Sequence, residues 1–182
     1  MWYKYLRPGI DFQKQSTGRF LVKRLVTLMA TLVVAFATMP VAMAANTPKA
    51  TVYPGHFDSE VYDADGDGVL VLRFSVTAVN ADICIDASAS TGGGAGVRFG
   101  FRGVRVTHYG AAIESSGELV NGDFVVRAGQ TETFRLTITV SDVRQSGFVS
   151  ARLTQIRWRS ESGRGVLRAP ADWMTALIFV SA

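Results

Sequence analysis

One stretch of the sequence restricts the possible folds more than any other, because its residues alternate in polarity like a β-strand. It runs Val69-Leu70-Val71-Leu72-Arg73-Phe74-Ser75-Val76-Thr77-Ala78-Val79, directly after an acidic turn at residues 63–68. The apolar side of this strand consists of Leu70, Leu72, Phe74, Val76 and Ala78, while Arg73, Ser75 and Thr77 take the other side. A strand with one apolar face needs a second layer to cover it. No later segment has the pattern of a long amphipathic helix, so we predict that another sheet forms this layer.

Later segments repeat the same alternation between turn signals. The clearest is 132–141, where Phe134, Leu136, Ile138 and Val140 share one side. We expect further strands at 50–53, 97–102, 124–126, 148–159 and 173–180, with a bulge near Thr154-Gln155. The short segments 57–62 and 111–115 are optional additions to this count, 83–85 continues the strand at 69–79 beyond a kink, and 104–109 extends or follows 97–102. About seven to nine strands with closely spaced turns predict an all-β fold, a two-sheet β-sandwich of immunoglobulin-like type, over residues 45–182.

The first 44 residues have the parts of a secretory signal peptide. Basic residues precede an uncharged apolar run from Leu25 to Val41, and Ala42-Met43-Ala44 supplies small residues around a cleavage site. We therefore predict export, with cleavage after Ala44 and a secreted or cell-surface location. The alternative is that the segment is retained as a membrane anchor, since an apolar run of about 17 residues is at the short end of what spans a bilayer.

Removing that segment changes the charge of the protein. The whole chain has 19 Lys and Arg against 15 Asp and Glu, of which residues 1–44 hold six and one, so the remainder has a net charge of −1. This balance does not favour a nucleic-acid partner, which needs a concentrated basic surface. The charge is uneven, however. Residues 58–86 are acidic and residues 127–168 are rich in Arg, so the two halves are expected to pair internally, to remain solvated, or to pair with a neighbouring copy.

The acidic turn is the sharpest candidate for a metal site. In Asp63-Ala64-Asp65-Gly66-Asp67-Gly68 the carboxylates alternate and glycine permits a sharp bend, as in the first half of a calcium loop. An EF-hand is excluded because Phe74 occupies the twelfth position, where a bidentate acid is required. A simpler calcium turn at Asp63, Asp65 and Asp67, completed by Asp58 or Glu60, is one interpretation. A solvated β-turn is the other.

Enzymatic interpretations have little support in the sequence. The predicted mature chain holds two histidines, His56 and His108, and a single cysteine, Cys84, which lies in a strand-like segment. No G-x-S-x-G elbow or phosphate-binding loop occurs. A Ser-His-Asp triad would be assembled only in space, so a small secreted hydrolase stays as a secondary alternative. We expect no catalytic residue and no certain cofactor, with calcium as the only candidate.

Two tryptophans are candidates for ligand contact. Trp158 shares its side of a strand with Ile156, which favours a place in the core over a place on a sugar-binding surface. Trp173 follows Pro170-Ala171-Asp172 and is predicted to be the exposed aromatic of a ligand site. The segment from Trp173 to Val180 is apolar on both sides, so we expect a strand that is central in a sheet or covered by a partner.

Three segments carry a resemblance to a known group of domains: 74–85, with "F-x-V-x-A" leading to "D-I-x-I", 126–134, with "V-x-x-G-x-T-x-x-F", and 153–158, with "L-x-x-I-x-W". They resemble small exported immunoglobulin-like domains of unknown function in bacterial surface proteins. The resemblance implies the fold and export, and it brings no catalytic residue.

These observations together predict an exported, non-catalytic interaction or structural module of the cell surface or envelope. Its expected partner is another surface protein or a cell-envelope glycan, and contact with a membrane is expected only through an uncleaved signal segment. The alternative function is a calcium-dependent carbohydrate-binding domain that uses the acidic turn and an exposed aromatic.

Overall fold

The computed structural model describes residues 48–182, which belong to one compact unit. The predicted signal peptide at 1–44 lies outside the described residues. Within the described part the chain forms strands joined by turns and no helix, so it is all-β, as the alternation predicts. It contains no helix that is long and apolar enough to cross a membrane.

The first sheet, here called sheet A, has four antiparallel strands in the order β1-β2-β9-β6. Their bounds are β1 Thr51–Ala64, β2 Asp67–Val79, β9 Thr131–Val143 and β6 Val106–Ser115. The strongly alternating stretch 69–79 lies in β2, which pairs with β9 along one edge and with β1 along the other, where a register shift between Pro54 and Phe57 interrupts the ladder. Sheet A is therefore built around this strand.

The second sheet, sheet B, follows the order β4-β5-β10-β3-β8-β7, with β11 and β12 also paired to β10. The bounds are β3 Ile83–Asp86, β4 Ala89–Ser90, β5 Val97–Gly103, β7 Glu118–Val120, β8 Asp123–Val126, β10 Gly147–Ser160, β11 Gly163–Arg168 and β12 Ile178–Val180. The long strand β10 is the centre of this sheet, because four other strands, β3, β5, β11 and β12, pair with it at different points.

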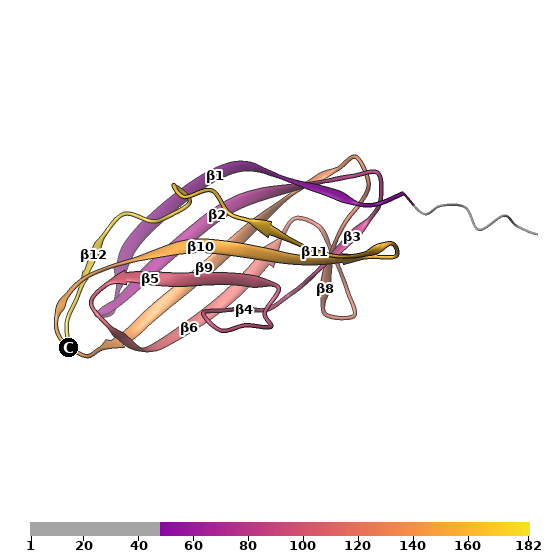
Figure 1. Cartoon of the computed structure of the whole chain (residues 1–182). Helices are drawn as coiled ribbons and strands as arrows, with labels where there is room; N and C mark the ends of the chain where they lie inside the picture. The colour runs from indigo at the N-terminus through magenta and orange to yellow at the C-terminus, as the bar shows by residue number, and fades with distance from the viewer. Residues whose placement is uncertain (1–47) are drawn as a thin grey trace, which may run out of the picture. The chain divides into compact units, whose positions relative to one another are not determined.

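The two sheets pack face to face around one apolar core (Figure 1). Sheet A contributes the apolar side of β2 together with Phe134, Leu136, Ile138 and Val140 of β9, all at most 1% exposed. Sheet B contributes inward residues such as Phe99, Leu153 and Ile156, which are equally buried. The architecture is a two-sheet β-sandwich. Each sheet presents one outer face, formed by the side chains that point away from the core.

One part of the strand prediction is confirmed in detail. The bulge expected near Thr154-Gln155 is present, because the pairing of β10 with β5 shifts register between Leu153 and Gln155. The polar segment after Ser160 forms a hairpin in which β11 returns along β10.

Other parts of the prediction are wrong in number or extent. The described residues form twelve strands instead of seven to nine. Part of the difference comes from strands such as β4 and β7, which are too short for their residues to show alternating polarity in the sequence. The segments 50–53 and 57–62 are one strand, β1, in which a register shift between Pro54 and Phe57 takes up the Pro-Gly pair. The bulge is held by the Ser75 hydroxyl, which accepts the N–H of His56 at 2.7 Å.

The final apolar segment also differs from its prediction. Only Ile178–Val180 is a strand, and it pairs along one edge with the start of β10. Residues 173–177 run irregularly, with Thr175 bonded to Ala151 in both directions. Phe179 and Leu177 are 53% and 60% exposed, so the segment is not central in the sheet, and its covering by a partner stays a prediction.

Candidate functional site

The acidic turn joins β1 to β2. Asp65 and Gly66 both have positive φ, 56° and 93°, which is the backbone of a type I′ hairpin turn. A carboxylate oxygen of Asp63 accepts the N–H of Gly66 at 3.1 Å. These features give the Asp-Gly pair a structural role as the connection between the two strands.

The fold brings neither of the two further candidate ligands to the calcium site predicted at Asp63, Asp65 and Asp67. The two carboxylates that the sequence offered to complete the site, Asp58 and Glu60, instead pair with Arg73. Among residues 48–182 no group of three or more His, Cys, Asp or Glu side chains is arranged to hold a metal ion. Calcium binding at this turn stays a prediction.

Trp173 is buried, so its prediction as an exposed aromatic is wrong. Its side chain is 4% exposed and stacks on Phe57 with ring centroids 5.3 Å apart, and Phe74 lies 5.9 Å away. The backbone explains this placement, because the carbonyl of Trp173 accepts the N–H of Leu153 and ties the residue to β10. Trp173 therefore fills the core between the sheets and is not available to a ligand.

Trp158 is half-buried and packs against the core, as its shared side with Ile156 predicts. It lies opposite Gly165 on β11, and a β-carbon at Gly165 would come within 2.2 Å of the indole ring. The glycine thus makes room for the ring.

The histidines and the cysteine are not assembled into a catalytic group in the described part of the chain. His108 lies 3.2 Å from Asp142, whose pKa is lowered by a hydrogen bond from Thr107 and then by His108. The side chains of this pair are 77% and 50% exposed, and neither histidine ring is hydrogen-bonded to a serine among residues 48–182. Cys84 is a free, half-buried thiol.

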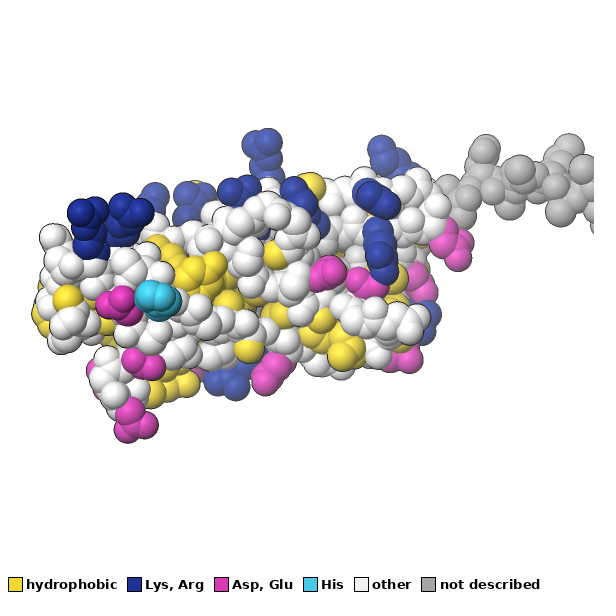
Figure 2. Space-filling model, turned by 90° about the horizontal axis from the view of Figure 1, so that it is seen from below, with side chains coloured by type: hydrophobic (Ala, Val, Ile, Leu, Met, Phe, Trp, Pro, Cys, Tyr) yellow, Lys and Arg dark blue, Asp and Glu magenta, His cyan; other side chains and the backbone are white. Residues whose placement is uncertain are grey.

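The outer face of sheet B concentrates arginines, a feature that the sequence analysis missed. We call it the arginine face, made of Arg98 and Arg102 on β5, Arg152, Arg157 and Arg159 on β10, and Arg164 and Arg168 on β11. These residues alternate with inward core residues, so their side chains project from the same side of the sheet. In Figure 2 the dark-blue side chains gather along the upper edge of the molecule.

The arginine face is poorly neutralised by the protein itself. Of the seven arginines of this face, only Arg159 has an ion pair with another described residue, Asp123 of β8. Across the strands the partners are neutral or basic: Ser150 faces Arg102, Gln155 faces both Arg98 and Arg168, and Arg164 faces Arg159. Like charges that face each other across a sheet repel, so this face has an excess of positive charge that an external anion would relieve.

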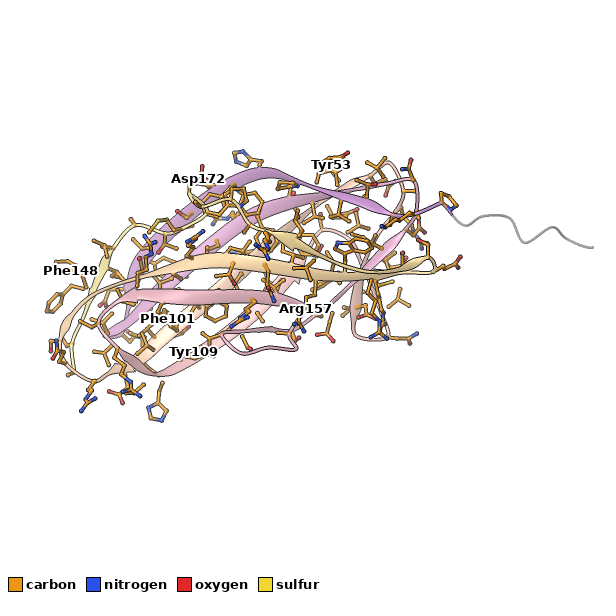
Figure 3. All side chains as sticks on the ribbon, viewed as in Figure 1. Tyr53, Phe101, Tyr109, Phe148, Arg157 and Asp172 are labelled. Atoms are coloured by element: carbon orange, nitrogen blue, oxygen red, sulfur yellow. The ribbon has the colours of Figure 1, made fainter. Side chains whose placement is uncertain are left out.

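A pocket of about 450 Å³ opens on the same face, at the end of β10. We call it the arginine pocket. It is lined by charged and polar side chains and by the glycines Gly94 and Gly96 of the loop before β5. The side chains that matter for its charge are Asp86, Asp123, Arg157, Arg159 and Arg164. Arg157 is exposed and lies close to this loop (Figure 3).

A second hollow, the aromatic groove, has a volume of about 570 Å³ and lies where the sandwich is open between β5 and β6. Phe99, Phe101 and Tyr109 meet there edge to face, with ring centroids 5.3–5.6 Å apart. Figure 3 shows Phe101 and Tyr109 on their two strands at this opening. The rings close the open side of the core, and the Tyr109 hydroxyl is bonded to Thr91 at 2.9 Å.

Comparison with known proteins adds no assignment to these sites. The sequence matches no protein-family model, and none of the curated proteins is significantly similar to it.

Proposed function

We propose that this protein is an exported, non-catalytic interaction module of the cell surface or envelope, and that the arginine face is its binding surface. The observation that carries the proposal is the excess of unpaired arginine on one face of a domain whose predicted mature net charge is −1. Positive charge has been gathered on one side although the domain as a whole is slightly acidic. Such a face attracts and orients an anionic partner.

The partner is an acidic glycan of the cell envelope. Arginine binds carboxylate and phosphate groups through a planar fork of donors, and repeated arginines suit a polymer with repeated negative charges. The other partner class expected from the sequence, a second surface protein, is an outcome that the experiment below separates from this one.

Export and the immunoglobulin-like type of the sandwich are part of the same proposal. The leader-like sequence before Ala45 supports export. Antiparallel pairing of all the described strands except the short parallel pair β4 and β5 supports the fold type, as do the repeated crossings of the chain from one sheet to the other. N-terminal sequencing of the secreted protein is expected to begin at Ala45.

The binding proposal is tested by co-sedimentation of the full chain with insoluble envelope glycan at low and high salt. We expect binding of the wild-type chain that weakens as salt rises, because exposed charges are screened within about 8–10 Å at physiological ionic strength. The double variant Arg98→Gln/Arg102→Gln is expected to lose most of this binding.

The matched control is Arg105→Gln/Arg144→Gln, which removes the same charge from two turns outside the arginine face. Equal losses in both variants would reduce the effect to net charge and contradict the proposal. Binding to envelope protein after the glycan has been removed would favour the surface-protein partner instead.

A further inference from the structure

The arginine pocket differs from the rest of the arginine face because it is hollow and has acidic residues in its wall. Asp123 is neutralised by an ion pair, whereas Asp86 keeps its charge, so three arginines and two carboxylates give the pocket lining a net charge of +1. Asp123 is 6% exposed and pairs with Arg159, and a carboxylate oxygen of Asp86 accepts the hydroxyl hydrogen of Ser88. The two remaining cations, Arg157 and Arg164, have no ion-pair partner among residues 48–182.

The register of β10 and β11 brings these two free cations to one place. Arg157 faces Val166 and Arg159 faces Arg164, so Arg157 and Arg164 are diagonal neighbours on the same side of the hairpin. Such positions are about 7–8 Å apart between backbones, within the reach of two long side chains that converge on one group. Both side chains are exposed, so both are free to turn toward a ligand.

The opposite wall of the pocket is a fixed piece of backbone. The N–H of Arg157 donates to the carbonyl of Gly96 at 2.7 Å, and a β-carbon at Gly96 would lie 2.1 Å from the carbonyl oxygen of Asp86. These contacts hold the loop against β3 and β10. Gly94, with φ +117° and no atom within 4 Å of its β-carbon position, leaves bare backbone at the pocket.

We propose that the arginine pocket binds the carboxylate of an acidic sugar, held between the guanidinium groups of Arg157 and Arg164. Arg159 is kept in place beside them by Asp123. Val166, 51% exposed and on the same side of the hairpin as Arg157 and Arg164, supplies an apolar contact for the body of a sugar ring. A volume of about 450 Å³ accommodates a short saccharide. This inference rests on the proposed function, since it names the unit of the glycan that the face recognises.

The test is calorimetric titration of the full chain with trigalacturonate, using neutral maltotriose as a matched sugar. We expect binding of trigalacturonate only, and at least a tenfold loss of affinity in Arg157→Gln/Arg164→Gln. Arg105→Gln/Arg144→Gln, which removes the same charge outside both the pocket and the arginine face, is expected to stay within about threefold of wild type.

A third variant, Arg157→Lys/Arg164→Lys, keeps the charge and removes the planar fork, so it is expected to bind more weakly than wild type while it unfolds at the same temperature. Its binding keeps the inference testable if the glutamine variant does not fold.

Three results would overturn the inference: no binding of trigalacturonate, equal loss of affinity in the pocket variant and in Arg105→Gln/Arg144→Gln, or displacement of trigalacturonate by an equal concentration of inorganic phosphate. The last result would assign the pocket to phosphate. The proposed function fails separately, when Arg98→Gln/Arg102→Gln sediments with the envelope glycan as wild type does.

Discussion

The outer faces of the two sheets carry arginine in opposite ways. On sheet A one row crosses all four strands as Asp58, Arg73, Arg135 and Glu114, so two facing arginines are flanked by two acids. On sheet B the row Arg98, Gln155 and Arg168 crosses β5, β10 and β11 without an acid. Sheet A neutralises itself, whereas sheet B leaves its positive charge for something outside the chain.

Cross-strand register, and not composition, therefore decides whether a charged face is free to bind. Exposed ion pairs such as those of sheet A contribute only about 0–1 kcal/mol to stability. Their main consequence is that they cancel the field of their own face.

The largest expected effect comes from the core that both faces share. Trp173→Ala removes a buried ring that stacks on Phe57, and we expect it to lower the free energy of unfolding by about 3–5 kcal/mol. The matched control is Phe179→Ala, because Phe179 is 53% exposed and its loss is expected to cost about 1 kcal/mol or less. Urea unfolding measures both, and equal losses would contradict the buried position of Trp173.

The second prediction compares one ion pair from each sheet. Asp123→Ala removes a carboxylate that is 8% exposed and leaves Arg159 facing Arg164, so we expect a loss of about 1–3 kcal/mol. Glu60→Ala removes an exposed partner of Arg73, while Asp58 remains, and is expected to cost less than about 1 kcal/mol. Urea unfolding that ranks the two variants the other way would mean that sheet B does not depend on Asp123.

The smallest effect concerns a pair at the crossing between the sheets. Asp82 accepts the N–H of Ala128 and pairs with Arg127, and these contacts lower its pKa. A carboxyl whose pKa is lowered by folding stabilises the folded state above its unfolded pKa, about 3.9, and this stabilisation is lost as pH falls through the folded pKa. We therefore expect Asp82→Asn to unfold at a lower urea concentration than wild type at pH 7, and the difference to vanish in strong acid. A difference that persists there would assign the effect to packing.

Much of the fold could be predicted from the sequence because burial of one side of a strand is a local signal. The alternation in 69–79 and 132–141 located β2 and β9, and the change of phase before Ile156 located the bulge in β10. The strand count and the end of the chain could not be predicted, since the apolar segment 173–180 has the composition of a strand but pairs only through its last three residues.

The candidate site was largely out of reach of the sequence. Outward arginines at 98, 102, 157 and 159 follow from the alternation, but no local pattern shows that β5, β10 and β11 are neighbours or that Gln155 lies between Arg98 and Arg168. The place of Trp173 is also set at long range, by a hydrogen bond to β10 and by the ring of Phe57. Its neighbours Pro170 and Asp172 wrongly indicated an exposed turn.

The most direct test that the arginine face is the binding surface uses the ¹⁵N-labelled full chain. It maps the backbone amides whose NMR signals shift when an acidic oligosaccharide is added. We expect the shifted amides to lie on β5, β10 and β11 and to shift less as salt is raised, while the amides of sheet A are unaffected. Shifts concentrated on β1, β2, β9 and β6, the self-neutralised face, would contradict this expectation.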